Sequence, residues 1–183
     1  MEEQMCNSES RIIRGMLRLT KLNDGPHLGI WSKITLKTGE QVSIGPPKLS
    51  DTVELTKFLS IVATENESIP ISESEITAQG VRTMILKMQR SDDVSLVVAR
   101  ANDTIIAFAE MQRAKYWMHD KTAKLGIVVD RKYRRKGIGR ALIEFLEEQP
   151  RNAQIRQISL LVPANNIDAI RFYRRLGFTN QGA

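Results

Sequence analysis

The order of apolar segments along the 183-residue chain predicts a mixed α+β fold. Two amphipathic helical patterns come early, a run of strand-like segments follows, and the last third alternates strand, helix, strand and helix. An antiparallel meander followed by a strand–helix–strand unit predicts a mostly antiparallel sheet with one parallel pair, flanked by helices. A composition of 42% hydrophobic and 26% charged residues agrees with a globular domain.

The first half of this pattern predicts one hairpin and two helices. Apolar and polar residues alternate over 34–44 about Thr38-Gly39, which is typical of a β-hairpin. Asp51 and Glu54 resemble a helix-capping pair, and apolar residues continue at helical spacing to residue 62. A second helix is predicted over residues 73–89.

The second half alternates strands and helices. Asn102-Asp103 is a turn pair and predicts a hairpin between the strands on either side. Gly177 predicts the end of the last helix. The expected strands cover residues 94–100, 104–112, 123–129 and 155–162, and the expected helices cover residues 138–149 and 167–176.

Charge and cysteine content limit the functional classes. The net charge of 27 − 21 = +6 favours anionic partners. The single cysteine, Cys6, excludes a disulfide framework within the chain and favours a cytoplasmic location. The N-terminus lacks a signal-peptide pattern, and no apolar run reaches membrane-spanning length. Residues 1–33 are expected to form an extension of unknown role before a domain of residues 34–183.

A basic, glycine-containing turn, DRKYRRKGIGRAL at residues 130–142, joins an apolar strand to an amphipathic helix. The first turn of a helix has backbone N–H groups without partners and attracts anions. Glycine at 137 and 139 would leave these N–H groups open to a phosphate, and nearby cations would strengthen the attraction. Two familiar phosphate motifs are excluded, because Gly139 is followed by Arg140-Ala141 and position 142 is leucine. A solvated charged turn remains the alternative at this point.

The flanking residues identify a resemblance to a known family. Arg134-x-x-Gly137-x-Gly139 follows a strand, and a second signature lies downstream. Together they resemble the two signatures of the GNAT superfamily of N-acetyltransferases. The second signature reads Ile155-x-x-Ile158-x-Leu160-x-Val162-x-x-x-Asn166-x-x-Ala169-Ile170-x-Phe172-Tyr173-x-x-Leu176-Gly177-Phe178.

The resemblance implies a GNAT fold with a splayed parallel strand pair and acetyl-CoA as co-substrate, without a metal. In this family the strand before the turn bonds the pantetheine arm, and the turn binds the diphosphate through its backbone. Asn166 matches an asparagine that binds pantetheine, and it is equally interpreted as a helix N-cap. The implied cofactor-binding residues are Ile127, Val128, Val129, Arg134, Arg135, Lys136, Gly137, Ile138, Gly139, Arg140, Asn166 and Tyr173.

The resemblance also implies catalytic roles. Tyr173 matches a tyrosine that protonates the departing thiolate, the alternative being a core aromatic. The backbone N–H of Val129 would hold the oxyanion. Many members place a basic glutamate where this chain has Lys124, which leaves the base unassigned. Glu110 is the first candidate and a water chain the second, although an ordinary exposed strand residue is the default interpretation of Glu110.

These residues predict an N-acetyltransferase acting on a primary amine of a small molecule or peptide, by direct attack in a ternary complex. The alternative is a catalytically impaired acyl-CoA-binding regulatory protein. A nucleic-acid-binding module fits less well, because aromatic residues make up only 5% of the chain. The family's usual C-terminal strand is missing from the pattern. The N-terminal extension, or a second subunit in a homodimer, is expected to cover the sheet edge this leaves.

Overall fold

The computed structural model describes residues 2–7, 20–22, 31–65, 76–114, 121–149, 152 and 154–180. Strands in these ranges join one sheet in the order β2-β3-β4-β5-β6-β7-β8-β1-β9. All neighbours run antiparallel except β7 and β8, which are parallel, so the predicted mixed sheet is confirmed. The strands are β1 (Glu2–Asn7), β2 (Thr20–Leu22), β3 (Trp31–Thr35), β4 (Gln41–Gly45), β5 (Val94–Ala101), β6 (Thr104–Arg113), β7 (Thr122–Val129), β8 (Gln157–Pro163) and β9 (Thr179–Asn180).

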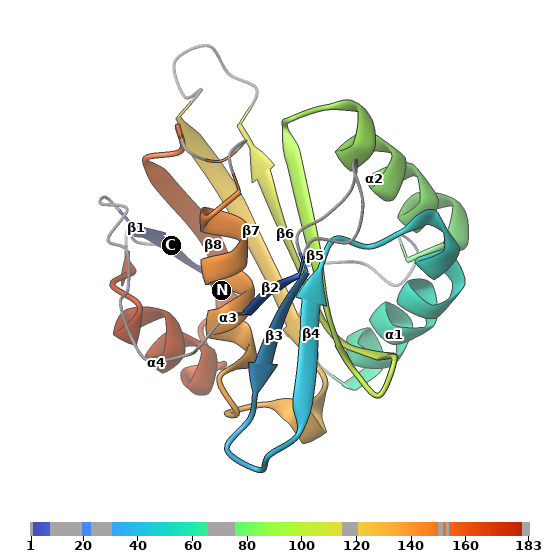
Figure 1. Ribbon diagram of the computed structural model, residues 1–183. Coiled ribbons are helices and arrows are strands. Elements are labelled where there is room, and N and C mark those ends of the chain that lie inside the picture. The colour runs from blue at the N-terminus through green and yellow to red at the C-terminus, as the bar shows by residue number, and fades with distance from the viewer. Residues whose placement is uncertain are drawn as a thin grey trace.

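Helices cover both faces of the sheet (Figure 1). On one face α1 (Thr52–Glu65) and α2 (Ala78–Arg90) pack on side chains of β5 and β6. On the other face, α3 (Ile138–Glu147) packs mainly on β5, β6 and β7, and α4 (Ile167–Arg175) joins the same apolar cluster. Two short 3-10 helices are η1 (Leu49–Asp51) and η3 (Arg131–Tyr133). None of the helices in the described ranges is both long and apolar enough to cross a membrane.

Local signals placed most elements correctly. The hairpin predicted over residues 34–44 is β3–β4. Asn102 and Asp103 both have positive φ, which matches the right-handed twist of a two-residue hairpin between β5 and β6. The second helix begins after the N-cap Thr77, whose side chain accepts a hydrogen bond from the Gly80 N–H. Most of its predicted first turn, from residue 73, lies outside the described residues.

Asp51 and Glu54 do not form the predicted capping pair of α1. Asp51 accepts a hydrogen bond from the Lys48 N–H and so caps η1, which precedes the helix. Both carboxylates also pair with Arg100 of β5, at 2.9 and 3.0 Å. Glu54 in addition accepts the backbone N–H of Ile105. These acids therefore attach the start of α1 to the β5–β6 hairpin, a long-range role that their spacing could not indicate.

The N-terminal strand β1 covers the outer edge of β8. Its register runs from Glu2 opposite Pro163 to Asn7 opposite Ile158, and β9 pairs with the far side of β1. Of the two covers expected, the N-terminal extension or a second subunit, the structure shows the N-terminal extension. Within the described residues only the two-residue β9 follows α4, and residues 8–19 and 23–30 lie outside the description.

Candidate active site

The parallel strands β7 and β8 separate partway along their length. In the described residues they pair only from Thr122 opposite Gln157 to Lys124 opposite Ser159. Each strand then continues, β7 to Val129 and β8 to Pro163, with its other edge paired to β6 or β1. The separation opens a wedge in the middle of the sheet, as the predicted splayed pair requires.

Strand alternation determines which backbone groups of β7 face this wedge. The Asp130 N–H donates to the Ile106 carbonyl at 2.9 Å, so even-numbered residues of β7 direct their backbone groups to β6. Ile127 and Val129 therefore direct their N–H and C=O groups toward β8. Val128 directs its backbone to Phe108 and contributes a buried side chain instead. Two of the three residues assigned to pantetheine thus present backbone groups to the wedge.

A cavity of about 420 Å³ passes through the wedge and is bordered by both faces of the sheet. The lining residues on the α3/α4 face include Leu125, Ile127, Leu160, Val162, Asn166, Ala169 and Tyr173. Those on the α1/α2 face include Phe108, Glu110, Gln112, Lys124, Gly126 and Val128. Groups on opposite sides of the sheet therefore meet at one opening.

Glu110 of β6 is half-buried at this cavity, so its default interpretation as an exposed strand residue is wrong. It lies opposite Gly126 of β7 in the sheet register. A Cβ atom at position 126 would lie 3.5 Å from Glu110 Oε1, which shows that the carboxylate leans over the glycine toward the wedge. Burial raises the pKa of Glu110, and the nearby charge of Lys87 partly lowers it. Glu110 is thus a carboxylate of raised basicity at the opening.

Tyr173 of α4 is a core aromatic residue, and its predicted role as general acid stays a prediction. Its ring is 8% exposed and packs edge-to-face on Phe172 and Phe178, with centroid separations of 5.0 and 5.5 Å. The residue also lines the cavity. Its hydroxyl has no hydrogen-bond partner among the residues that the structure describes, and burial raises the pKa of the phenol above its usual range. The side chain therefore remains protonated and can donate a proton.

Asn166 is the N-cap of α4, because its Oδ1 accepts a hydrogen bond from the Ala169 N–H at 3.1 Å. It also lines the cavity. The cap bond occupies the side-chain oxygen, and the amide Nδ2 remains as a donor. The capping interpretation is confirmed, and the ligand-binding interpretation stays a prediction.

The basic turn at the end of β7 leaves several backbone N–H groups without protein partners among the described residues. Arg135 and Gly137 both have positive φ, +61° and +88°, and Gly137 is the N-cap of α3. Within the described part of the chain, the backbone N–H groups of residues 135–139 donate no hydrogen bond to protein. Alternating backbone conformations of this kind bring successive N–H groups to one side. The turn is therefore ready to receive an anion.

The two glycines of the turn have different roles. A Cβ atom on Gly137 would meet no protein atom within 4 Å, so this glycine is required by its backbone angle and leaves open space. A Cβ atom on Gly139 would lie 3.2 Å from Phe172 Cζ. Gly139 therefore allows α3 to pack closely on α4, in addition to the ligand access for which it was predicted.

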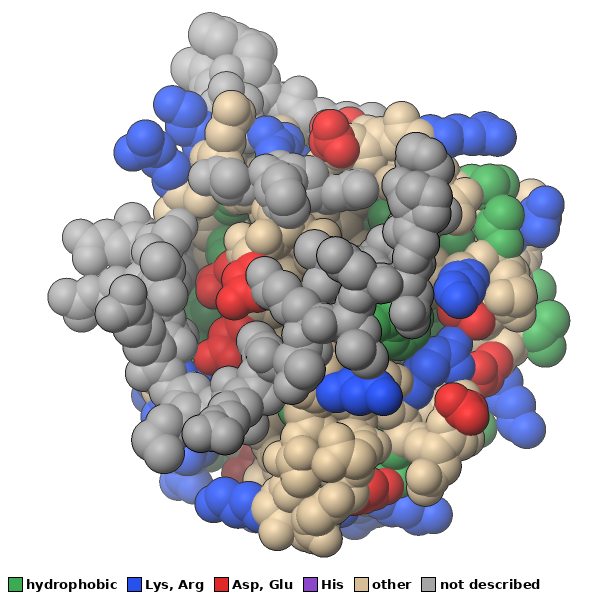
Figure 2. All heavy atoms as spheres, in the orientation of Figure 1, with side chains coloured by type: hydrophobic (Ala, Val, Ile, Leu, Met, Phe, Trp, Pro, Cys, Tyr) green, Lys and Arg blue, Asp and Glu red, His purple; other side chains and the backbone are tan. Residues whose placement is uncertain are grey.

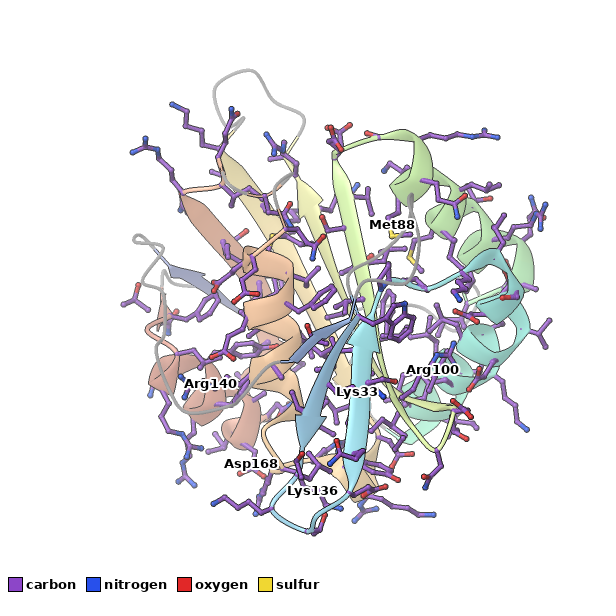
Figure 3. The ribbon with its side chains drawn as sticks, in the orientation of Figure 1. Lys33, Met88, Arg100, Lys136, Arg140 and Asp168 are labelled. Atoms are coloured by element: carbon purple, nitrogen blue, oxygen red, sulfur yellow. The ribbon has the colours of Figure 1, made fainter. Side chains whose placement is uncertain are left out.

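Several basic side chains around the turn are engaged within the protein. Arg134 Nε donates to the Val129 carbonyl at 3.0 Å, and Arg135 pairs with Asp168 on α4. Arg140 Nε pairs with Glu144 at 2.9 Å. Lys136 and Asp168 lie at the same end of the molecule (Figure 3). These contacts hold the turn in place, and its open donors belong to the backbone.

The β3–β4 hairpin also supports the turn. The Tyr133 hydroxyl donates to Glu40 Oε1 at 3.0 Å, and Lys136 Nζ lies 4.9 Å from the centre of the Tyr133 ring. Glu40 follows the tip of the hairpin, which reaches the same end of the molecule as the start of α3 (Figure 1). A contact between residues 93 positions apart thus helps to position the basic turn.

Sequence reasoning missed Gly126 as a site residue. An isolated glycine inside an apolar strand indicates a close approach of another group, and this signal was present in AKLGIVV. Cavity residues of β8, such as Ser159, Leu161 and Pro163, carried no comparable signal. Their position depends on where β8 leaves β7, which is a tertiary property.

Comparisons with known proteins agree with this geometry. The Acetyltransferase (GNAT) family model matches residues 61–178. A ribosomal protein bS18-alanine N-acetyltransferase from Escherichia coli K12 is 39% identical over 59 residues, which are 32% of this chain and 40% of that protein. The chain thus matches well under half the length of that curated relative.

Solved structures share the fold. A GNAT-family acetyltransferase from Streptococcus pneumoniae aligns with a TM-score of 0.70 and 23% identity, over 77% of this chain and 86% of that one. The PaiA N-acetyltransferase from Thermoplasma acidophilum, in complex with coenzyme A, aligns with a TM-score of 0.61 and 20% identity, over 75% and 89%. Because the family model spans more than half of its residues, this chain belongs to the GNAT family of acetyltransferases.

Proposed function

We propose that this protein transfers an acetyl group from acetyl-CoA to a primary amine of a small molecule or peptide, by direct attack in a ternary complex. The observation that carries the proposal is the cavity between β7 and β8. A half-buried carboxylate, Glu110, borders it on one face of the sheet, and a buried phenol, Tyr173, borders it on the other. A reaction that needs a base and an acid on opposite sides of one carbonyl fits this arrangement.

The residues present fit acetyl-CoA. The pantetheine arm is an extended chain with amide groups. The strand edge offers it the backbone groups of Ile127 and the N–H of Val129, whose carbonyl already accepts from Arg134. The turn at the end of the same strand offers backbone N–H groups to a diphosphate, and Gly137 leaves open space beside them. The Thermoplasma protein of the same fold was solved in complex with coenzyme A, which supports coenzyme A as the ligand.

Three groups of the chain would act on the substrates. Bound acetyl-CoA supplies the thioester carbonyl and the thiol leaving group. Glu110 takes a proton from the acceptor ammonium, and its raised pKa makes it a better base than an exposed glutamate. The Val129 N–H donates to the oxygen on which negative charge develops. The Tyr173 hydroxyl gives its proton to the leaving sulfur, and the second proton that the nitrogen loses as it becomes an amide restores the phenol.

Thiol release from acetyl-CoA against a panel of amines tests the proposal, repeated with Tyr173→Phe. The phenylalanine ring keeps the packing on Phe172 and Phe178, and the lost hydroxyl has no partner among the described residues. We expect an unchanged Tm and a loss of kcat of about a hundredfold or more. Full activity of the variant on an active substrate would show that Tyr173 is not the acid.

The alternative, an acyl-CoA-binding protein without turnover, is favoured by Lys124 at the position expected to hold the base. It predicts calorimetric binding of acetyl-CoA with no thiol release from any amine. A nucleic-acid surface has less support. On the face in Figure 2, the coloured Lys and Arg side chains lie in separate groups, at the rim and near the centre, with acidic side chains among them, and those drawn in colour form no continuous stripe.

A further inference from the structure

Two opposite charges lie on the α1/α2 side of the cavity. Glu110 and Lys124 both line it, and both project from the same face of the β6–β7 pair. Lys124 lies opposite Gln112, and Glu110 lies opposite Gly126. The two charged positions are therefore diagonal neighbours, and their Cα atoms are roughly 7 Å apart.

Lys124 is exposed and forms no ion pair with any residue in the described ranges. It occupies the last residue of β7 that pairs with β8, at the closed end of the wedge. The anion-binding turn lies at the opposite, open end, beyond Val129. An acetyl-CoA molecule whose diphosphate lies at the turn therefore reaches the position of Glu110 first, and Lys124 lies beyond Glu110.

We propose that the acceptor is a small amine that also carries a carboxylate, of which an α-amino acid is the simplest kind, and that Lys124 binds this carboxylate. The inference rests on the proposed function, because it assigns the acceptor half of the same cavity. The acceptor's ammonium faces Glu110 while its carboxylate faces Lys124. The spacing of the two side chains leaves room for a molecule whose charges are a few bonds apart.

The size of the cavity supports a small acceptor. A volume of about 420 Å³ is at the low end for small-molecule sites, and the pantetheine arm must share it. The N-terminal amine of a peptide has an amide, not a carboxylate, at the position that Lys124 would contact. The charge pair therefore favours a free amino acid over a peptide.

Matched acceptor triplets test the inference through kcat/KM for thiol release from acetyl-CoA. Suitable sets are alanine, alaninamide and ethylamine, and phenylalanine, phenylalaninamide and phenethylamine. A hydrogen bond to a charged group contributes about 1.5–3 kcal/mol. The amino acid of each triplet should therefore be preferred over its amide and its amine about ten- to hundredfold. Because the carboxylate is remote from the reacting atoms, the preference should lie mainly in KM.

Substitutions then assign the preference to Lys124. We expect Lys124→Met to abolish the preference for the amino acid, by lowering its kcat/KM toward that of the matched amine, which has no carboxylate. Lys124→Glu should invert the preference, because the new carboxylate repels the substrate's own. Lys121→Met is the matched control, since Lys121 is an exposed lysine that does not line the cavity and its loss changes the net charge equally.

The outcomes separate this inference from the proposed function. Turnover of amines without preference for a carboxylate, or a preference for an alanine-initiated peptide, overturns the inference and leaves the acetyltransferase proposal intact. Loss of the preference in Lys87→Met rather than Lys124→Met overturns the assignment of the lysine. If no amine is turned over, the proposed function fails. Calorimetric binding of phenylalanine against phenethylamine, with coenzyme A present, then decides whether Lys124 selects the carboxylate.

Discussion

Replacing Gly137 with alanine tests whether the backbone of the basic turn binds the diphosphate. The φ angle of Gly137 is +88°, and an L-residue held there costs about 1–2 kcal/mol. Alanine also lowers the conformational entropy of the unfolded chain, which raises the free energy of unfolding by about 0.4–1 kcal/mol. No protein atom lies within 4 Å of the added Cβ atom, so no clash adds to the cost. The net loss is therefore about 1 kcal/mol, which lowers Tm by about 2–4 °C.

The effect on binding should be larger than the effect on stability. The open space beside Gly137 is where the diphosphate would lie, so the new methyl group displaces it from the N–H groups of the turn. Each charge-assisted hydrogen bond lost costs about 1.5–3 kcal/mol. We expect isothermal titration of coenzyme A to give a Kd at least tenfold higher for the folded variant. A Kd within twofold of the original would refute the backbone site.

Lys136→Met is the matched comparison, because it removes a charge from the same turn and leaves the backbone conformation in place. The Lys136 ammonium lies 4.9 Å from the Tyr133 ring centre and is one of several cations near the site. We expect only a few-fold loss of affinity, which diminishes further in high salt. If this variant binds coenzyme A more weakly than Gly137→Ala does, the side chains rather than the backbone dominate.

Three further predictions concern stability and architecture. Burial and two neighbouring glutamates raise the pKa of Glu147 to about 7, so the folded chain binds an extra proton between pH 4.5 and 7 and loses stability as the pH rises through that window. Glu147→Gln should therefore raise Tm above pH 7 and leave it unchanged at pH 4; an equal gain at both pH values would contradict this. Asn166→Ala removes the cap bond to Ala169 and should cost about 1 kcal/mol in denaturant unfolding, whereas Asn166→Asp should retain the cap. Removing residues 1–7 deletes β1 and exposes the edge of β8, so light scattering should show self-association; a stable monomer with unchanged Tm would show that β1 is dispensable.

Local residue patterns predicted much of the fold. The turn at Asn102-Asp103, the stop at Gly177 and the cap at Asn166 depend on interactions within a few positions, and all three are present. The interpretation of Asp51 and Glu54 was wrong for the opposite reason. Their spacing suggested a local cap, while their actual partners include Arg100, about fifty residues away.

Some site residues were likewise predictable from local patterns, and others depended on tertiary contacts. Gly137 and the helix it opens were recognisable because positive φ and an exposed helix N-terminus are local properties. Glu110 was only one candidate for the base, because alternation within a strand does not say which neighbour lies opposite. Its burial and its position over Gly126 depend on the register between β6 and β7.

By itself, the sequence determined the order of elements, the basic glycine turn and the two signatures that place the chain in its family, since each depends on residues close together in the chain. Only the tertiary structure decided that β7 and β8 part after Lys124 and that β1 covers the outer edge of β8. It also brought Glu110 and Tyr173 to one cavity from opposite faces of the sheet. Strand register and divergence result from packing between distant segments, and no local pattern of residues encodes them.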